Sequence, residues 1–415
     1  MKKYLLISFI FINLLNAKTL TLQDAIDKTL TNHPDIKSFT LKIQQSKAGY
    51  KAAYANYLPQ INAEANYNAV QTFVFPFNGV FNTVDDDSWS VGVALKQKVW
   101  DFSKTSNRVD ATKLDEKISK LSLEDLKALM VYKVKSLYDL MVVQSEAIKV
   151  REKDLESKRA YYAQAKALVQ NGLKTEADAS RFLSAVYIAE DNLAIAKSSY
   201  EKAKSTLSLY MNEKIDDSVE LEESLLYKDL KVSSQNEEEL DKQNYQLQIY
   251  AYTVEKNKLL HKSAKASHYG SIDAYASYTH LDTLNEYDST LAGISLSIPI
   301  YSGGMLSAEA QKAEIAAQIS NEQKASKLLA LKDELNSLLL DIERYNKTIA
   351  AKKAQMDSAM STKNVLEGRY KEGLATYIEV LDATSLVLNA KLGLLEAYYQ
   401  KSMAINRIEY LKGKI

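Results

Sequence analysis

The sequence predicts a mainly α-helical protein with short β segments, in which the two halves of the chain share one plan. Two observations carry the helical part of this prediction. The 415 residues include only 12 Gly and 4 Pro, far fewer than in an average protein, and helix formers such as Ala, Leu, Lys and Glu are abundant, so long helices should fill most of the chain. The third observation is a repeat at a fixed spacing, which predicts the duplicated plan.

The first 17 residues have the pattern of a secretory signal peptide. Lys2 and Lys3 precede an apolar run from Tyr4 to Leu15, and Ala17 supplies a small residue at a plausible cleavage site. The run is too short to span a bilayer, which favours a cleaved signal over a membrane anchor. The chain contains no Cys. Disulfides and a lipid-modified N-terminal cysteine are therefore excluded, and packing alone has to hold the exported protein together.

Charge and motif content exclude several classes of function. Lys plus Arg and Asp plus Glu balance at 53 each, which argues against a nucleic-acid partner, because such a protein needs a basic excess. The four histidines show no metal-ligand spacing, and we find no nucleophile elbow, phosphate loop or dinucleotide fingerprint. We therefore expect no catalytic, cofactor-binding or metal site, and we interpret the pair Gly303-Gly304 as a strand-to-helix junction.

The repeat is seen when the chain is compared with itself. "VGVALKQKVWDFS" from Val91 matches "AGISLSIPIYSGG" from Ala292 at an offset of 201 residues, and the same offset carries Gly172-Leu173 onto Gly373-Leu374. Upstream, "LPQINAEANY" matches "YGSIDAYASY" at an offset of 211 residues. The first half should therefore carry extra residues, which we place in a loop at residues 70–88.

Each half is predicted to have the same order of elements: a helix, a β hairpin, a long helix and a returning helix. An acidic, serine-rich stretch joins the halves and is interpreted as a connector. We expect a signal peptide at 1–17 and a first repeat at 18–215, with a helical segment from Leu22 to roughly Leu58, a hairpin at 60–99 and helices at 103–171 and 173–213. A connector follows at 216–240. The second repeat, at 241–415, has a helical segment from Leu240 to roughly Tyr269, a hairpin at 271–300 and helices at 304–371 and 374–412.

The long helices carry the apolar spacing of a coiled coil. No Gly or Pro occurs from Lys104 to Asn171, which at ~1.5 Å per residue corresponds to a helix about 100 Å long. A helix of that length needs a packed face along its whole length. In the second half the apolar residues alternate in steps of three and four, which is the coiled-coil spacing: Leu328, Leu331, Leu335, Leu338, Ile342, Tyr345 and Ile349.

The hairpin segments alternate apolar and polar residues. "QINAEANYNAV" and "SIDAYASYT" place small or apolar residues on one face and mostly polar residues on the other. Two structures stay open at this point: a soluble sandwich with one wet face, and strands that cross a bilayer. Four strands are too few to close a barrel, and a membrane does not tolerate open strand edges. Membrane-spanning strands would therefore require several protomers around one barrel.

Taken together, these segments resemble the TolC family of outer-membrane efflux and secretion channels. The resemblance rests on "LTLQDAIDKTLTNHPDI" near the N-terminus, "YANYLPQINAEANY" before the first hairpin, "LSIPIYSGGMLSAEAQKA" after the second and "RYKEGLATYIEVLDA" near the end. The order and duplication of these motifs are specific, and they cover the mature chain. The resemblance implies a homotrimer in which each protomer adds four strands to a shared transmembrane β-barrel, continued across the periplasm by a barrel of long coiled-coil α-helices.

The resemblance also implies partners and gives a role to the two Gly-Leu turns. An inner-membrane pump of the RND or ABC type and a periplasmic adaptor would work with the channel, outer-membrane lipid would surround its barrel, and no cofactor is implied. The turns would form the periplasmic tip. They would contact the adaptor through Gly172, Leu173, Thr175, Gly373, Leu374 and Thr376.

Charged residues near these turns would form a gate. Glu379 and Asp382 match acidic positions at the family's tunnel constriction, and in a trimer they would form two stacked rings of carboxylates. A basic residue that helps to close the tip in other members would fall at Ala375, so this chain departs from the pattern there. The resemblance assigns possible gate contacts to Asp178, Tyr370, Lys174 and Arg181, and the strand-to-helix transition to Pro299, Gly303 and Gly304.

Two functions stay open on the sequence. The resemblance favours a passive exit duct for an efflux pump or a type I secretion system, which itself binds no nucleotide. The alternative is a structural coiled-coil protein of the periplasm or the cell surface without channel activity. The sequence does not say whether the exported cargo is a drug, a metal ion or a protein, because the pump and the adaptor largely choose it.

Overall fold

A computed structural model of the chain describes residues 19–217, 219, 221–222 and 242–413. The expected signal peptide and most of the expected connector lie outside these residues. The chain divides into two compact units. The sheet unit consists of Lys37–Asp125 and Asp241–Ala330, and the helical unit of Met1–Ile36, Leu126–Leu240 and Leu331–Ile415. Among the described residues, the helices include none with the length and apolar character that crossing a membrane requires.

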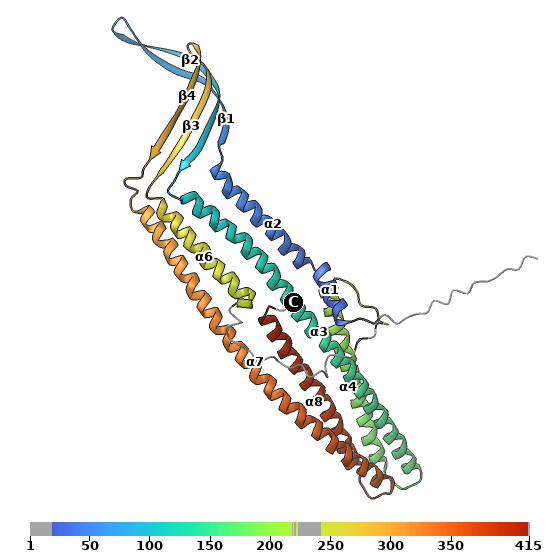
Figure 1. The fold of residues 1–415 in the computed structure, drawn as a ribbon. Coiled ribbons are helices and arrows are strands. Elements are labelled where there is room, and N and C mark those ends of the chain that lie inside the picture. Colours follow the sequence, from blue (N-terminus) through green and yellow to red (C-terminus); the bar gives the residue numbers. More distant parts are fainter. Residues whose placement is uncertain (1–18, 218, 220, 223–241, 414–415) are drawn as a thin grey trace, which may run out of the picture. The chain divides into compact units, whose positions relative to one another are not determined.

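The sheet unit contains one antiparallel sheet of four strands in the order β1-β2-β3-β4 (Figure 1). β2 and β3 come from different halves of the chain, and their pairing, with Val93 opposite Tyr278, joins the two repeats. The two predicted hairpins are therefore confirmed, and together they make a single sheet. The strands are β1 Gln60–Phe77, β2 Val80–Trp100, β3 Ser271–Asp282 and β4 Glu286–Ser297.

The first hairpin is longer than the sequence predicts. Instead of a loop at residues 70–88, β1 and β2 continue to a two-residue turn at Asn78-Gly79. Both turn residues have positive φ, 51° at Asn78 and 78° at Gly79, as a type I′ turn requires. The prediction of a loop was wrong because an Asn-Gly pair between alternating aromatic residues is itself a strong hairpin signal.

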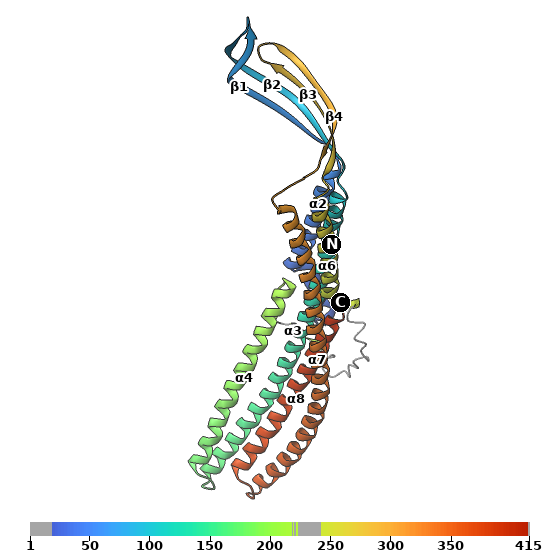
Figure 2. The ribbon, with the colours of Figure 1, turned by 90° about the vertical axis from the view of Figure 1, so that its left-hand side faces the viewer.

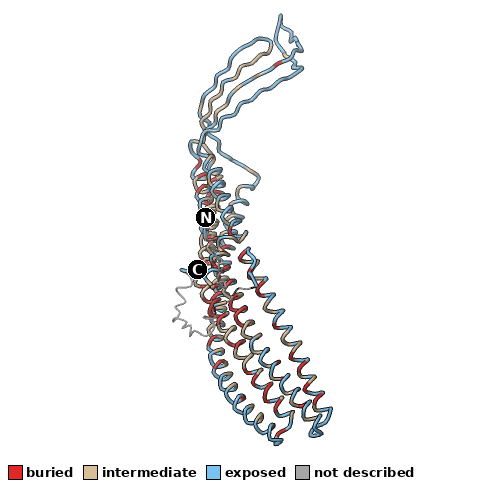
Figure 3. The backbone as a smooth tube through the Cα atoms, turned by 90° about the vertical axis from the view of Figure 1, so that its right-hand side faces the viewer, coloured by how far each residue is buried: buried red, intermediate tan, exposed pale blue. Residues whose placement is uncertain are grey.

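The two faces of the sheet differ in polarity. Residues directly opposite each other in antiparallel strands share a face. Away from the β3–β4 turn, one face carries Ile61, Val93, Leu95, Ile272, Ala276, Tyr278, Ile294 and Leu296, and the other carries Asn62, Glu64, Asn66, Ser90, Lys96, Ser277, Thr279 and Ser295. Next to that turn the difference is lost, because the first face also carries His280, Asp282, Glu286 and Asp288, and the second carries Leu281, Tyr287 and Leu291. β1 and β4 are largely exposed, whereas β3 between them is mostly of intermediate exposure (Figure 3). On the apolar face the exposed fractions reach 66% at Ile61 and 74% at Ile294.

The N-terminal helical segment is broken, whereas the sequence predicts one helix from 22 to 58. α1 Leu22–Asn32 ends before α2 Pro34–Tyr54, and the short helix η1 Ala55–Tyr57 follows. His33 between them has an extended backbone, with φ −64° and ψ 130°. The residue before a proline avoids helical angles, while a proline is well suited to the first position of a helix. The prediction of a single helix was therefore wrong at the His33-Pro34 step.

Helix contacts stabilise the sheet unit. α6 Tyr245–Ala266 packs beside the first parts of the two long helices that run through both units. Lys256 of α6 forms an ion pair with Asp115 at 2.6 Å, and Asn257 donates a hydrogen bond to Ser320. Ser263 Oγ donates to the carbonyl of Lys104 at 2.8 Å. These contacts cross from the second repeat to the first at Asp115 and Lys104 and stay within the second at Ser320.

In the helical unit four helices run side by side (Figure 2). The predicted coiled-coil spacing is confirmed there, because Leu331, Leu335, Ile342 and Ile349 are all less than a tenth exposed. The largest core cluster includes Val134, Tyr138, Met141, Leu207 and Met211. The helices are α3 Lys104–Gln170, α4 Glu176–Met211, α7 Met305–Lys371 and α8 Tyr377–Leu411.

One carboxylate is buried in this bundle. Asp139 of α3 is 3% exposed, and its Oδ2 accepts hydrogen bonds from Ser402 Oγ at 2.6 Å and Asn406 Nδ2 at 3.0 Å, both on α8. Burial raises the pKa of the Asp139 carboxyl above its ordinary value, although these hydrogen bonds and the nearby Lys135 act in the opposite direction. The net direction means that the charged form of Asp139 is disfavoured by the fold.

Candidate functional site

The two Gly-Leu turns connect α3 to α4 and α7 to α8, and they share one backbone geometry. In the first, Gly172 has a φ of 69°, and the amides of Gly172 and Leu173 donate to the carbonyls of Val169 and Leu168, both at 2.9 Å. In the second, Gly373 has a φ of 75°, and the equivalent bonds measure 3.1 and 2.8 Å. This is a Schellman motif, whose left-handed position favours glycine.

Each returning helix begins with a capping box. At α4, Asp178 Oδ2 accepts from the backbone N of Thr175 at 3.1 Å and from its Oγ1 at 3.0 Å. At α8, Glu379 Oε2 accepts from the N of Thr376 at 2.6 Å and from its Oγ1 at 2.8 Å. These bonds, the backbone bond first, hold the pKa of both carboxyl groups below its usual value. A threonine followed three residues later by an acid is the sequence signal of such a box, and our sequence analysis did not use it.

This cap bears directly on the predicted acidic rings. Glu379 is exposed, but one of its carboxylate oxygens is held by Thr376 within the same chain. Asp382 is exposed one turn further along α8. Because a ring needs further copies of the chain, the two stacked rings stay a prediction. In the single chain, Asp382 presents the more available of the two charges.

The other predicted gate residues lie close enough to act on one another. After its capping bonds, the charges of Lys174 and Arg181 also lower the pKa of Asp178, and after burial, the charge of Asp178 also raises the pKa of Tyr370. Lys174 lies in the exposed first turn, whereas Ala375 at the equivalent place of the second turn is 8% exposed. The guanidinium of Arg181 on α4 lies over the ring of Tyr377 on α8, 5.3 Å from its centroid. Asp178 is engaged by its capping threonine. Arg181 thus reaches from α4 to α8, and the charge of Asp178 on α4 acts on Tyr370 of α7.

An aromatic hub that sequence reasoning missed lies behind the turns. Phe182 is fully buried, and its ring centroid lies 6.0 Å from Tyr161, 6.3 Å from Tyr370 and 5.7 Å from Tyr377. These four residues, which we call the aromatic hub, come one each from α4, α3, α7 and α8. The available signal was the buried stripe on α4, at steps of three and four residues, which contains Ala179, Phe182, Val186 and Ala189.

The strand-to-helix junctions of the two repeats share a backbone conformation but not their residues. After β4, Pro299 leads into Gly303 and Gly304, whose φ values are 61° and 82°, and α7 begins directly afterwards. The equivalent residues of the first repeat are Phe102 and Ser103, with φ values of 55° and 68°. Residues with a Cβ are strained in this region of backbone space. The first junction therefore needs compensating contacts.

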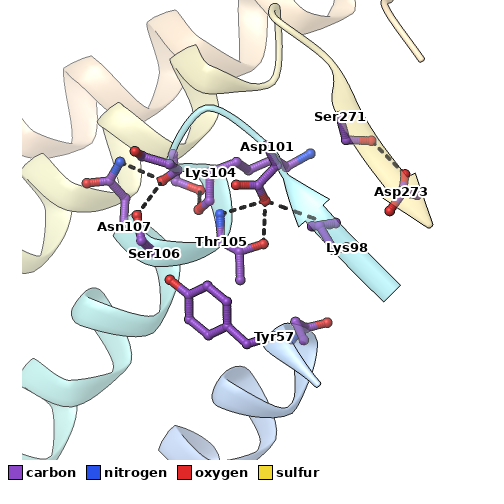
Figure 4. A network of polar contacts seen from close by, with 12 residues as sticks. Tyr57, Lys98, Asp101, Lys104, Thr105, Ser106, Asn107, Ser271 and Asp273 are labelled. Carbon is purple, nitrogen blue, oxygen red and sulfur yellow. Dashed lines mark hydrogen bonds and ion pairs between the residues drawn. The ribbon is translucent and has the colours of Figure 1, made fainter. Parts of the chain in front are cut away.

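Asp101 supplies those contacts (Figure 4). Its Oδ2 accepts hydrogen bonds from the backbone N of Thr105 at 2.9 Å and from the Thr105 hydroxyl, and Lys98 Nζ lies 3.8 Å away. Asp101 and Thr105 are both less than a tenth exposed. A carboxylate placed at a helix N-terminus in this way stabilises the first turn of α3. At the equivalent place of the second repeat, Ser302 Oγ accepts a longer bond from the backbone N of Leu306 at 3.5 Å. The repeats therefore differ in the strength of the cap and in the two glycines that relieve the strain.

The helical unit also contains a cleft of about 510 Å³ between α3, α7 and α8. Asp154 lines it, and the described residues offer no hydrogen bond to its buried Oδ1, which lies 3.8 Å from Lys158 Nζ. Burial raises the pKa of Asp154, and Lys158 acts in the opposite direction. Lys363 and Lys391 make the lining mixed in charge. In the described part of the chain, no group of three or more His, Asp or Glu side chains is placed to hold a metal ion.

Comparison with known proteins agrees with this architecture. A solved structure of CusC superposes with a TM-score of 0.86 at 18% identity, covering 95% of this chain and 92% of that one, which shows a shared fold. The probable outer membrane lipoprotein SilC of Salmonella typhimurium is 23% identical over 410 residues, 91% of this chain and 82% of that protein. Outer membrane protein TolC of Escherichia coli (strain K12) is 32% identical over 133 residues, 32% of this chain.

The match to TolC spans only 27% of that protein's length, so the match that decides the family is a different one. The model of the family described as outer membrane efflux protein matches residues 25–213 and 238–414. These ranges contain both hairpins, both long helices, both Gly-Leu turns and both capping boxes. The chain therefore belongs to the family of outer membrane efflux proteins.

Proposed function

We propose that the protein is a homotrimeric, passive exit duct of the outer membrane, which works with an inner-membrane pump and a periplasmic adaptor. Membership of the outer membrane efflux protein family supports the location and the direction of transport. The names of TolC and SilC, both outer membrane proteins, support the same location. The observation that best supports a trimer is the different polarity of the two faces of the four-stranded sheet.

The sheet has the properties of one third of a barrel. β1 and β4 are its edge strands, and in lipid both edges must pair with other strands. Three chains with four strands each give a closed barrel of twelve strands. The exposed apolar residues, such as Ile61 and Ile294, then face lipid, and the polar face with Asn62 and Ser277 lines a water-filled interior.

The turns are proposed as the docking surface for the adaptor. Leu173 and Leu374 follow the two turn glycines and are 68% and 67% exposed. Exposed apolar side chains at matched positions suit contact with a helical hairpin of another protein. An RND or ABC pump of the inner membrane would supply the energy, because this chain carries no nucleotide-binding motif.

Glu379 and Asp382 are proposed as the charge filter of the duct. Each residue would occur three times around the axis of a trimer, and rings of carboxylates favour cations. The capping bonds from Thr376 hold one oxygen of Glu379. We therefore assign the larger share of the selectivity to Asp382.

The test is reconstitution of the purified full-length protein. We expect a trimer by native mass spectrometry and discrete, cation-selective conductance steps in planar bilayers. The competing assignment is a structural coiled-coil protein of the periplasm or cell surface. Recovery of the native protein as a monomer in the soluble periplasmic fraction, without conductance, would contradict the exit duct and support that alternative.

Crosslinking from the turns tests the partner assignment. The chain has no cysteine, so Leu173→Cys and Leu374→Cys each carry a single site for a photoactivatable reagent. Both variants should capture the same adaptor in cells. Leu209→Cys, equally exposed at 73% but near the other end of α4, is the control and should not capture it. Equal capture by all three variants would contradict docking at the turns.

A further inference from the structure

We propose that the aromatic hub is the latch that holds the two helical hairpins together at their turns, with Phe182 as its positioning residue. This proposal rests on the proposed exit duct, because the latch would set the resting state of that duct. The first hairpin is formed by α3 and α4, and the second by α7 and α8.

The arrangement of the rings is the first observation. Phe182 belongs to the first hairpin, yet two of its three ring neighbours, Tyr370 and Tyr377, belong to the second. Both of these contacts are edge-on, with interplanar angles of 62° and 66°. Edge-to-face aromatic pairs attract beyond the effect of burial alone. Separation of the hairpins would break both pairs at once and expose a fully buried phenylalanine.

Small residues around the hub are the second observation. Ala165, Ala179, Ala375 and Val380 complete the same buried cluster. Ala375 is 8% exposed, whereas Lys174 at the equivalent place of the first turn is exposed. A basic side chain at residue 375 would start from within an apolar cluster and would disturb its packing. Residue 375, where the resemblance places a basic gate residue, is therefore part of the apolar cluster that forms the latch.

Two polar contacts flank the hub and cross between the same hairpins. The hydroxyl of Tyr161 on α3 donates a hydrogen bond to Glu367 on α7. The guanidinium of Arg181 on α4 lies over Tyr377 on α8. Both contacts use an aromatic residue of the hub as one partner. They therefore orient the rings, while the apolar packing between the rings provides most of the attraction.

A latch of this kind has a recognisable salt dependence. Exposed ion pairs weaken as the ionic strength rises, whereas apolar packing does not, and strongly hydrated anions such as sulfate strengthen it. The low resting conductance of the parent should therefore not be raised by opening of the latch in concentrated salt. The latch should open when volume is removed from the hub or wedged into it.

The experiment compares single-channel conductance in planar bilayers for the full-length protein and its variants. Phe182→Ala should raise the resting conductance several-fold, and Phe182→Leu, which keeps most of the apolar volume, should restore the parent value. Leu207→Ala is the matched control, because Leu207 is also fully buried but belongs to another cluster. It should destabilise the protein and leave the conductance unchanged.

Ala375→Arg gives an opposing test that does not depend on Phe182. A latch made by charge predicts that this added basic residue lowers the resting conductance, whereas the aromatic hub predicts that it raises it. If Phe182→Ala does not assemble, this variant decides the matter alone.

Two kinds of result distinguish a failure of the proposed exit duct from a failure of the proposed latch. A parent protein that forms no conducting trimer would contradict the exit duct itself. A conducting parent whose Phe182→Ala variant assembles normally and keeps the parent conductance, or an Ala375→Arg variant that closes the channel further, would overturn the aromatic latch and leave the duct intact.

Discussion

The two helical turns share one backbone geometry but differ in several side chains in and after the turn. Both combine a Schellman glycine with a capping box, and they lie 201 residues apart, as Gly172 and Gly373 do. At the same offset the first repeat has two basic residues and a phenylalanine, where the second has an alanine, an aspartate and another alanine. These pairs are Lys174 with Ala375, Arg181 with Asp382, and Phe182 with Ala383.

The comparison shows what a duplication can vary. The turn geometry depends on a left-handed glycine and a threonine with a following acid, and these are the same in both repeats. The side chains between and after them are free to differ: at these positions the first repeat has larger and positively charged residues, and the second has small residues and a negative charge. Phe182 and Ala383 are both buried, at 0% and 2% exposed.

The divergence continues away from the turns. Asp139 of the first repeat is 3% exposed, whereas Leu340 at the equivalent place of the second is 69% exposed. A buried acid and an exposed leucine reverse the ordinary distribution of residues. The same helical register therefore faces different neighbours in the two repeats. An exposed leucine at this register is what a contact with another protomer would cover.

The largest expected effect on stability comes from adding volume at the buried Ala383 of the second repeat. Ala383→Phe places a ring where the structure has a buried alanine, and overpacking of this kind costs about 1–3 kcal/mol of unfolding free energy. Chemical denaturation of the detergent-solubilised protein measures it. Leu386→Phe, at a half-exposed site on the same helix, is the control and should change stability by less than about 0.5 kcal/mol. Tolerance of Ala383→Phe would show that the two repeats are interchangeable at this point.

Replacing each turn glycine should have a smaller and equal effect. Gly172→Ala and Gly373→Ala should each cost about 1–2 kcal/mol, the strain of a left-handed residue with a Cβ. Apart from the adjacent residues, the described part of the chain places no atom within 4 Å of a Cβ at either glycine, so backbone strain is the expected cause. Gly49→Ala, within α2 and equally uncrowded, should be neutral or stabilising. Unequal losses of stability at the two turns would show that interactions other than the shared backbone geometry stabilise one of them.

Asp139→Asn should stabilise the protein at neutral pH by a few degrees in Tm. The fold raises the pKa of Asp139, so the native state binds this proton more tightly than the unfolded state does. The stability of the parent therefore falls as the pH rises above the ordinary aspartate value of 3.8. The asparagine can still accept the bonds from Ser402 and Asn406, and its advantage should vanish below that pH.

Asp178→Asn is the matched control for the sign of this effect. The capping bonds lower the pKa of Asp178, so its charged form contributes stability above the ordinary aspartate pKa and loses it as the pH falls through the lowered value. This variant should therefore destabilise at neutral pH and become neutral in acid. Thermal melts of both variants from neutral to acidic pH measure the two slopes, and slopes of the same sign would contradict the assignments.

The smallest effect on stability is expected for Asp382→Ala at the proposed charge filter, whereas Glu379→Ala also removes the capping box of α8. Asp382→Ala and Glu379→Ala together should weaken cation selectivity and block by multivalent cations in planar bilayers, and Asp382→Ala alone should account for most of the change. The reason is that Thr376 already holds the carboxylate of Glu379. Reversal potentials under a salt gradient give the measurement. A larger loss from Glu379→Ala than from Asp382→Ala would reverse this order.

Periodicity predicted the parts of the fold that depend on the local chain. The coiled-coil spacing from Leu328 to Ile349 marks the buried side of α7, and the alternation in "QINAEANYNAV" marks the two faces of β1. The turns at Gly172 and Gly373 follow from glycines at the ends of long helices. Each of these features repeats one local rule many times, or marks the place where that rule stops.

The missed features depend on contacts between distant segments or on a single local exception. The aromatic hub needs four helices to meet, and no spacing along α4 distinguishes Phe182 from an ordinary core residue. Asp101 caps α3 through Thr105, across Phe102 and Ser103, whose positive φ values sequence patterns disfavour for residues with a Cβ. The break at His33 and the turn at Asn78 were legible, because proline and Asn-Gly signals mark them.

The tip of the long first hairpin is a suitable site for inserting a tag. Beyond Trp89, β2 pairs with β1 alone, so the ribbon that ends at Asn78-Gly79 stands apart from the four-stranded sheet. Among the described residues other than its chain neighbours, none comes within 4 Å of a Cβ at Gly79, and exposed turn tips tolerate inserted sequence. An affinity tag inserted at this tip would give a handle on the intact assembly. Such a handle leaves both helical turns, and whatever binds them, untouched.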